Sequence, residues 1–471
     1  MKKIILTIIS MISLVLSACS TETEMIRESP DFQSDSSTSS EETSSFVFDI
    51  EQYKKELEES DMQTSPNVRG KLFDSEGKTL SYSEPDGNIQ FIRVYSQEYA
   101  EAFAPLISDP SGGIDSINDS QLRINNCIAT PNGEGQSLML TLDADKQLKL
   151  YNILKNKGIV GCITAIKQDG ALIAAVSTPS YDPNLYCTDP EYAKEINDST
   201  NTPLICKSIE KRTPGSVFKI ISCTLSQKHG FTTYYDQGYL TYQGTRIKNW
   251  DYGATYYPQQ RDLINLFRNS SNSGFAQSFL NMSDEDILKD CRELFYLSDE
   301  LKTETDFGSI HNSLKLTDKA RSAFGQSDVK LSPVYVAMLT IGTVTGDIPQ
   351  PYCISSAVNT MNANEVIEKK QSPKVLATIP GEYRKPTIEG MRQIAGDLDL
   401  DSLNTPVYAK TGTAEIDGQQ DTLWITSCIQ LSDKEYCAVV LQVRNPNDYN
   451  YTYASNMNKL YIDILKIIIE E

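Results

Sequence analysis

The chain has 471 residues, enough for one large domain and a smaller one. Its 63 Asp and Glu residues outnumber its 43 Lys and Arg residues, which gives a formal net charge of −20. This acidic balance argues against nucleic acid as a ligand, because a polyphosphate binder needs a basic surface. Beyond the first residues, no run approaches the apolar length of a membrane span, so we expect a soluble body.

The N-terminus has the pattern of a secretory signal. Lys2 and Lys3 precede the apolar run Ile4–Leu16, which is too short for a typical spanning helix. The run ends in Leu-Ser-Ala-Cys19, which resembles the bacterial lipobox, where the cysteine thiol receives a diacylglyceryl group. The alternative is an ordinary cleaved signal with a chance cysteine. We predict a lipoprotein signal peptide over residues 1–18. A multiply acylated Cys19 would hold the chain on the extracytoplasmic face of the bacterial cytoplasmic membrane.

Two further segments separate this signal from the main body. Residues 19–45 are rich in Ser, Thr and Glu and nearly free of large apolar side chains, so burial cannot offset their ordering entropy. We predict a disordered tether there. Residues 46–135 form a small N-terminal module, which opens with an amphipathic helix over Phe46–Glu59.

Within that module the pattern indicates short strands and turns. Glu76-Gly77 is the turn of a hairpin, and Ile89–Tyr95 is a further strand. Glu98–Ala104 is predicted to be a short helix that Pro105 ends.

Residues 136–471 make up the second and larger domain. Strands and helices are expected as follows: a strand over Ser137–Leu142, a helix over Asp145–Asn156 after the capping residue Asp143, hairpins over 161–177 and 423–443, mainly helices over 216–344, and a final helix over Ala454–Glu471. Hairpins at both ends with helices between them predict an antiparallel sheet with helices on its faces.

Ser216-Val-Phe-Lys219 has the spacing S-x-x-K. Positions i and i+3 share one helix face, about 5–6 Å apart at Cβ, so Lys219 can reach the Ser216 hydroxyl. A lysine whose pKa is lowered by burial and by neighbouring cations can take the serine proton. Pro214-Gly215 signals a helix start, and the first turn favours developing negative charge. Taken alone, the motif also fits two polar residues on a solvated helix face.

Ser270-Ser-Asn272 has the spacing S-x-N. The Ser270 hydroxyl could relay a proton between a base and a leaving amine, and the Asn272 amide could hydrogen-bond a substrate amide. The alternative is a simple polar loop, but an apolar helical pattern follows at once.

Lys410-Thr411-Gly412-Thr413 follows a strand-like run. Glycine at a sheet edge permits the close approach of another backbone or a ligand. Lys410 would supply a charge for a substrate carboxylate, and the Thr hydroxyls would hydrogen-bond it. The Thr413 amide could donate to an oxyanion. An ordinary edge strand with a bulge is the alternative.

Other site chemistries have little support. With two histidines and no G-x-S-x-G motif, a Ser-His-Asp hydrolase is disfavoured, which leaves a lysine-assisted serine. The cysteines show no CxxC pair, so a zinc site is not expected. Cys187 and Cys206 bracket the polar segment before the nucleophile helix and are a candidate disulfide, although free buried thiols are commoner.

The three motifs, in this order, resemble those of penicillin-binding proteins and serine β-lactamases. Pro214-Gly-Ser-Val-Phe-Lys219 is similar to P-G-S-T-F-K, and Lys410-Thr-Gly-Thr-Ala-Glu415 matches K-T-G-T-A-E. Ser177–Asn184 is similar to S-x-P-S-x-D-P-N, and Arg69–Asp74 resembles the start of the N-terminal module. The chain therefore resembles the class B, monofunctional penicillin-binding transpeptidases.

The resemblance implies an α/β (α+β) fold, with a five-stranded antiparallel sheet flanked by helices over 136–471 and a dimerisation-like pedestal over 46–135. It implies a peptidoglycan D,D-transpeptidase that cross-links stem peptides through an acyl-enzyme, with carboxypeptidase side activity open. Neither a metal nor an organic cofactor is expected. The implied partners are stem peptides ending in D-Ala-D-Ala, an acceptor amine, β-lactams as covalent inhibitors and a glycan-polymerising enzyme.

The same resemblance assigns roles to individual residues. Ser216 is the nucleophile and Lys219 its base, while Ser270, Asn272 and Lys410 complete the catalytic set. The substrate-binding residues are Thr411, Gly412 and Thr413.

Three departures from the family pattern suggest a divergent member. The usual Thr after the nucleophile is Val217, an Asn-Arg pair is replaced by Cys206-Lys207, and a G-Q-G motif reads Gly325-Gln-Ser327. Two rival functions remain at this point, a class D-like serine β-lactamase and a non-catalytic, β-lactam-sensing or wall-binding lipoprotein.

Overall fold

The computed structural model describes residues 69–85, 91–118, 122, 136–254, 257–359, 362–369, 373–415, 421–449 and 451–470. All of them belong to one compact unit. The predicted signal peptide, Cys19, the tether and the helix over 46–59 lie outside these residues. None of the helices in the described part combines the length and the apolarity that crossing a membrane requires.

The centre of the unit is an antiparallel five-stranded sheet in the order β18-β19-β20-β5-β6. Its strands are β5 (Gly161–Lys167), β6 (Leu172–Thr178), β18 (Val407–Ala414), β19 (Thr422–Ser432) and β20 (Glu435–Val443). The two predicted hairpins are confirmed, and the pairing of β20 with β5 joins them although they are far apart in the sequence. Strand residues are buried almost continuously, as expected for a sheet that is covered on both faces.

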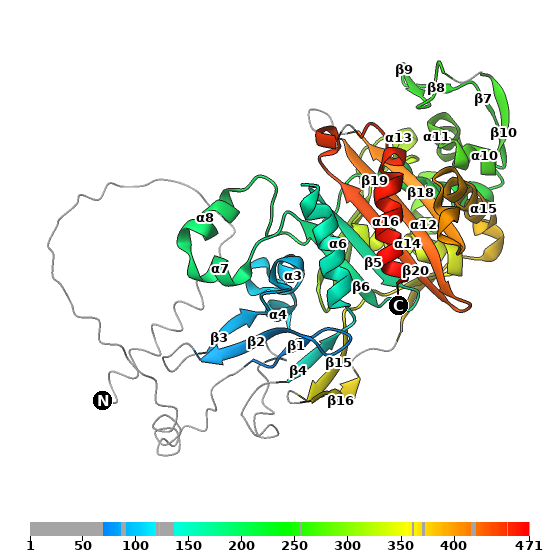
Figure 1. Ribbon diagram of the computed structural model, residues 1–471. Coiled ribbons are helices and arrows are strands. Elements are labelled where there is room, and N and C mark those ends of the chain that lie inside the picture. Colours follow the sequence, from blue (N-terminus) through cyan, green and yellow to red (C-terminus); the bar gives the residue numbers. More distant parts are fainter. Residues whose placement is uncertain are drawn as a thin grey trace, which may run out of the picture. The chain divides into compact units, whose positions relative to one another are not determined.

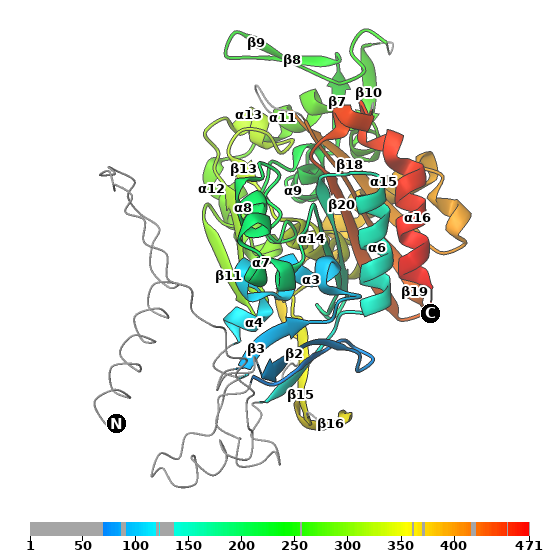
Figure 2. The same ribbon diagram turned by 60° about the vertical axis from the view of Figure 1, so that its left-hand side comes forward.

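Helices cover both faces of this sheet, as predicted (Figures 1 and 2). One face carries α6 (Ala144–Asn156) and α16 (Asn458–Ile469); the other carries α14 (Pro333–Thr345) and, beyond it, α9 (Lys219–Lys228). The Asp143 carboxylate caps α6 by accepting the Lys146 amide at 2.9 Å, as predicted. The side chains of α14 are buried on nearly every side, which explains its lack of a polar face.

A second, six-stranded sheet has the order β16-β15-β4-β1-β2-β3. Its strands are β1 (Leu72–Phe73), β2 (Thr79–Pro85), β3 (Phe91–Tyr95), β4 (Ser137–Leu140), β15 (Ile354–Asn359) and β16 (Asn362–Lys369). The predicted turn at Glu76-Gly77 is present, where the Asp74 carboxylate accepts the amides of Glu76 and Lys78. The boundary predicted at residue 135 cuts across this sheet, because β4, β15 and β16 come from the larger domain.

The helix predicted to end at Pro105 continues through it. Helix α3 spans Ala100–Ile107, with Pro105 inside. Proline removes one amide donor and leaves the carbonyl four residues earlier, that of Glu101, without its helical partner. The Ser180 hydroxyl donates to this carbonyl at 2.6 Å. A tertiary contact that local sequence could not reveal therefore replaces the lost hydrogen bond.

The middle of the chain holds more strands than predicted. Helices are present, namely α10 (Leu263–Arg268), α11 (Asn272–Leu280), α12 (Asp284–Phe295) and α13 (Lys319–Ser322). Between and beside them run short strands, namely β7 (Thr233–Asp236), β8 (Tyr239–Tyr242), β9 (Thr245–Lys248), β10 (Gln259–Asp262), β11 (Leu301–Thr305), β12 (Gly308–Leu314) and β13 (Val329–Lys330). The pairs β7–β10 and β8–β9 form an arm beyond α10 and α11 (Figure 1). Such two-stranded pairs are too short to show a clear period in sequence.

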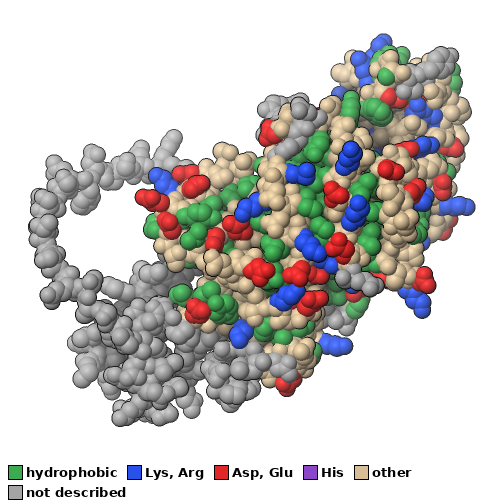
Figure 3. Space-filling model, viewed as in Figure 1, with side chains coloured by type: hydrophobic (Ala, Val, Ile, Leu, Met, Phe, Trp, Pro, Cys, Tyr) green, Lys and Arg blue, Asp and Glu red, His purple; other side chains and the backbone are tan. Residues whose placement is uncertain are grey.

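The remaining elements connect these layers. They are η1 (Asp109–Ser111), α4 (Ile114–Ile117), α7 (Pro183–Thr188), α8 (Pro190–Asp198), η2 (Gly215–Phe218), β14 (Asp347–Pro349), β17 (Val375–Thr378), α15 (Gly381–Asp397), η3 (Leu400–Leu403), η4 (Pro446–Tyr449) and η5 (Ala454–Met457). Figure 3 shows basic side chains interspersed with acidic ones over one face of the described part.

The candidate disulfide is wrong. Cys187 is exposed on α7, Cys206 is buried, and both are free thiols. Burial raises the pKa of the Cys206 thiol. Cys206 therefore behaves as a small core residue, the commoner alternative for a free cysteine.

Candidate active site

The S-x-x-K motif lies at the junction of two helical segments. Ser216 is in the 3₁₀ turn η2, and Lys219 is the first residue of α9. The two residues between them, Val217 and Phe218, are buried in the core and anchor the turn. Side chains at i and i+3 nearly eclipse each other in a 3₁₀ turn, so Ser216 and Lys219 point the same way. Lys219 Nζ lies 2.8 Å from Ser216 Oγ.

The strand with the K-T-G motif passes unusually close to this turn. A Cβ on Gly412 would lie 2.8 Å from Val217 Cγ2 and 2.9 Å from the Pro214 carbonyl oxygen, so no side chain fits there. Gly215, at φ +55°, faces the Thr413 carbonyl with the same lack of room. The prediction that a glycine permits close approach at this edge is confirmed. The close contact places Thr413 beside the turn that carries Ser216.

The second motif reaches the same lysine from the other side. Ser270 adopts a left-handed conformation at φ +52°, and Asn272 opens helix α11. Lys219 Nζ lies 2.7 Å from the Ser270 carbonyl oxygen, 3.0 Å from Ser270 Oγ and 2.7 Å from Asn272 Oδ1. The Asn272 amide nitrogen donates to the Lys248 carbonyl at 3.0 Å, which turns its oxygen toward Lys219.

The contacts of Lys219 fix the direction of its lone pair. A neutral amine has two N–H donors and one lone pair. The Ser270 carbonyl and Asn272 Oδ1 can only accept hydrogen bonds, so together they use both donors. The lone pair is then left for a hydroxyl, and the Ser216 hydroxyl is the nearer at 2.8 Å. This arrangement suits removal of the proton from Ser216.

Burial lowers the pKa of both lysines of the cluster. The Lys219 side chain is fully buried, and burial together with the nearby charge of Lys410 holds its pKa well below the ordinary value of 10.5. Burial lowers the pKa of Lys410 to about 7. A buried amine without a counter-charge favours its neutral form, which is the form that a general base requires.

Lys410 connects the second and third motifs. Its Nζ donates to Ser270 Oγ at 3.3 Å and to the Thr411 carbonyl at 2.8 Å, and it lies 5.5 Å from the centre of the Phe267 ring. On β18, Thr411 and Thr413 share one partly exposed face, because side chains alternate along a strand. This face can receive a ligand that lies along the strand.

The structure brings together Ser216, Lys219, Ser270, Asn272 and Lys410, with Thr411–Thr413 alongside. Sequence reasoning missed three neighbours: Lys248, Phe267 and Phe324, whose ring centre is 5.8 Å from Lys219 Nζ. None of them belongs to a motif, and only tertiary folding brings them near the lysines. Within the described residues, no group of three or more His, Cys, Asp or Glu side chains is arranged to hold a metal ion.

The chain is similar to known proteins along most of its length. A family model described as the penicillin-binding protein transpeptidase domain matches residues 161–466. Penicillin-binding protein 3 of Bacillus subtilis is 29% identical over 306 residues, which is 61% of this chain and 44% of that protein. Peptidoglycan D,D-transpeptidase PbpA of Mycolicibacterium smegmatis is 26% identical over 385 residues, which is 72% of this chain and 76% of that protein. Against the Bacillus protein, the chain thus spans less than half of the relative's length.

Solved structures show the same fold. Penicillin-binding protein A from M. tuberculosis, as an imipenem acyl-enzyme complex, superposes with a TM-score of 0.74 at 20% identity, covering 86% of this chain and 100% of that one. The D,D-transpeptidase domain of a peptidoglycan glycosyltransferase from Eggerthella lenta gives a TM-score of 0.68 at 18% identity, covering 85% of this chain and 99% of that one.

The matched residues 161–466 span the central sheet, both buried lysines of the cluster and all three motifs. Together with the clustering of these motifs around Lys219, the match shows that this chain belongs to the family of proteins with a penicillin-binding protein transpeptidase domain.

Proposed function

We propose that this protein is a peptidoglycan D,D-transpeptidase in which Ser216 is the nucleophile and Lys219 its general base. One observation carries the proposal: the buried Lys219 amine has both donors directed at pure acceptors and lies 2.8 Å from the Ser216 hydroxyl. The names of the relatives, peptidoglycan D,D-transpeptidases among them, support the same chemistry.

In this proposal the reaction is a double acyl transfer. Ser216 Oγ attacks the penultimate D-Ala carbonyl of a stem peptide, and its proton passes to Lys219 Nζ. The peptide C–N bond breaks, and the departing D-Ala nitrogen takes a proton through Ser270 Oγ, which contacts both lysines. An amine of a second stem peptide then attacks the ester. This step releases Ser216 with a proton and forms the cross-link.

Substrate recognition falls to the other members of the cluster. Asn272 hydrogen-bonds the donor peptide amide, and charged Lys410 with Thr411 and Thr413 receives its terminal carboxylate. The Thr413 amide donates to the oxyanion of the tetrahedral intermediate. A β-lactam, which presents a similar carboxylate and acyl group, acylates Ser216 and stays bound as an ester.

The proposal extends to the location and partners of the protein. Acylation of Cys19 after removal of residues 1–18 holds the domain on the outer face of the cytoplasmic membrane, where its substrate is found. The family resemblance also implies cooperation with a glycan-polymerising enzyme. The Cys19→Ala variant should remain an unprocessed precursor without acyl mass, whereas a mature chain that starts elsewhere would refute the anchor.

The test of the activity is mass spectrometry of the intact protein after treatment with a labelled penicillin. Wild type should gain one penicillin mass on the peptide that contains Ser216, and Ser216→Ala should gain none. A second measurement follows the transfer of a D-Ala-D-Ala donor peptide to an added amine. This transfer activity should be lost in the same variant. Labelling of Ser216→Ala at the wild-type rate would refute the site.

The lifetime of the penicilloyl ester distinguishes a transpeptidase from a serine β-lactamase, which uses the same nucleophile chemistry. A transpeptidase should keep the penicilloyl ester far longer than a β-lactamase, which positions a water to hydrolyse it. Rapid release of hydrolysed penicillin by wild type would instead identify a β-lactamase. Absence of labelling and transfer in wild type would identify a non-catalytic protein.

A further inference from the structure

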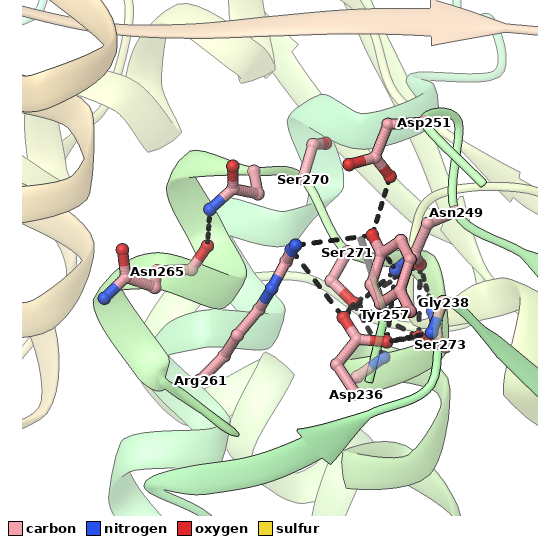
Figure 4. A network of polar contacts seen from close by, with 12 residues as sticks. Asp236, Gly238, Asn249, Asp251, Tyr257, Arg261, Asn265, Ser270, Ser271 and Ser273 are labelled. Atoms are coloured by element: carbon pink, nitrogen blue, oxygen red, sulfur yellow. Dashed lines mark hydrogen bonds and ion pairs between the residues drawn. The ribbon is translucent and has the colours of Figure 1, made fainter. Parts of the chain in front are cut away.

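The second motif, Ser270–Asn272, and the next residue, Ser273, alternate between two environments. Ser270 and Asn272 contact the catalytic lysine through the atoms described above. Ser271 and Ser273 turn the opposite way, and both of their hydroxyls donate to the Asp236 carboxylate, at 2.9 and 2.8 Å (Figure 4). The motif is therefore held from behind by a residue that is more than thirty positions away in sequence.

Asp236 ends strand β7 and is completely buried. Besides the two serine hydroxyls, it accepts the Gly238 amide at 2.8 Å and the Asn249 side-chain amide at 3.0 Å. The Arg261 guanidinium lies 3.7 Å away and is itself almost fully buried. A buried carboxylate is costly unless it is hydrogen-bonded and balanced in charge, and here both conditions are met.

The chain that leaves β9 forms the other half of this support. The Lys248 carbonyl accepts the Asn272 side chain, Asn249 Oδ1 accepts the Ser273 amide at 3.0 Å, and Trp250 Nε1 donates to the Asn269 carbonyl at 3.0 Å. Three consecutive residues thus bind along the second motif. Figure 4 shows Asn249 beside Asp236, behind the motif. We call Asp236 and Asn249 the rear clamp.

The rear clamp holds the neighbours of a residue with an unfavourable backbone conformation. A non-glycine residue in the left-handed region stays there only if its surroundings determine it. Ser270 is at φ +52°, and its carbonyl supplies one of the two acceptors that orient Lys219. Its neighbour Ser271 caps helix α11 by accepting the Gly274 amide at 3.0 Å while donating to Asp236. If Ser271 moves, the Ser270 carbonyl and Asn272 Oδ1 move with it.

We propose that Asp236 and Asn249 are positioning residues for acyl transfer, because they hold the second motif at hydrogen-bonding distance from the Lys219 amine. The proposal rests on the proposed function, but it concerns residues that touch neither substrate nor nucleophile. Because a displacement of about 1 Å in catalytic geometry can cost about 10²-fold in rate, loss of the clamp should slow acylation without preventing β-lactam binding.

The test uses a fluorescent penicillin and measures two constants separately. One is the first-order rate constant of acylation, and the other is the dissociation constant of the noncovalent penicillin complex that precedes it. Asp236→Asn should lower the rate constant about 10²-fold and change the dissociation constant less than threefold. The matched control is Asp290→Asn. Asp290 is also a buried carboxylate and pairs with Lys228 and His229 at the far end of α9, roughly 13 Å from Lys219. This control should acylate at the wild-type rate.

A double-mutant cycle distinguishes positioning from a general loss of stability. Ser273→Ala and Asn249→Ala should each lower the rate constant about tenfold, and neither should lower it further in the Asp236→Asn background. The proposal would be overturned if a folded Asp236→Asn variant acylates within twofold of the wild-type rate. It would also be overturned if the effects of the single substitutions on the rate constant multiply in the double variants. If Asp236→Asn does not fold, wild-type rates in both alanine variants would overturn it. Failure of wild type itself to acylate would reject the proposed function instead.

Discussion

Two regions of the described part bury basic side chains in opposite settings. In the six-stranded sheet, the Arg93 guanidinium pairs with Asp115 through two nitrogens, at 2.6 and 3.1 Å, and the pair is almost inaccessible to water. Arg69 pairs with Asp109 nearby. In the active site, Lys219 and Lys410 are buried at least as deeply, yet no acid from the described residues lowers the cost of their charge.

This difference separates structural from chemical use of a buried cation. Arginine cannot lose its proton in a protein, so a buried guanidinium needs a carboxylate. Lysine can become neutral when it is desolvated, and the absence of an acid is what lowers its pKa. The chain has a surplus of 20 negative charges, so composition alone does not explain why no acid lies beside these two lysines.

The largest effect should follow from removing the unpaired amine. Lys219→Met should lower the rate constant of penicillin acylation by at least about 10²–10⁴-fold, because the proton of Ser216 loses its acceptor. The free energy of unfolding in urea should change little, because relief of the desolvation cost of the buried amine offsets its hydrogen bonds to Ser270 and Asn272. Lys149→Met, at an exposed lysine of α6, is the control. Acylation within tenfold of wild type would break the contrast between the two regions.

A paired cation should show the opposite pattern. Asp115→Ala leaves Arg93 charged and buried, so the free energy of unfolding should fall by about 3–5 kcal/mol, while the folded fraction acylates at the wild-type rate. The exposed pair of Arg268 and Asp397 provides the comparison. Asp397→Ala should cost less than about 1 kcal/mol, because solvent screens an exposed pair. Equal losses from the two substitutions would contradict this interpretation.

The two lysines should also give opposite pH dependences, one in the rate constant of acylation and one in binding. Lys219 must be neutral to accept a proton, so the acylation rate constant should fall as the pH drops through the pKa of Lys219. Because this pKa is lowered, the rate constant should reach its high-pH plateau well below pH 10. Lys410 must be charged to bind a carboxylate, and its pKa is about 7. The dissociation constant of penicillin should therefore rise above pH 7, by up to about tenfold per pH unit. Lys410→Arg, which keeps its charge, should remove that rise, whereas a flat profile in wild type would refute the assignment.

Local sequence was sufficient for several parts of this structure. The i, i+3 spacing of Ser216 and Lys219 placed their side chains together, because that geometry belongs to one helical turn. The hairpins around the central sheet and the Asp143 cap followed from turn and capping residues in the same way. Each of these features depends on neighbours within a few residues, whose conformations the backbone itself restricts.

Other features needed contacts between distant segments. Helix α3 continues through Pro105 because Ser180 replaces the lost hydrogen bond, and β4, β15 and β16 join one sheet from three parts of the chain. No periodicity encodes such partners. The same holds for the strands β7–β10, which sequence analysis read as part of a helical region.

The sequence alone determined which functional groups this protein has: a serine and a lysine one turn apart, an S-x-N loop and a K-T-G strand, in a chain with two histidines. Only the tertiary structure decided that Lys219 is buried with Lys410 as its charged neighbour, and that Asp236 holds the second motif from behind. The physical reason is that a pKa depends on desolvation and on nearby charges, and both arise when segments far apart in the sequence pack together.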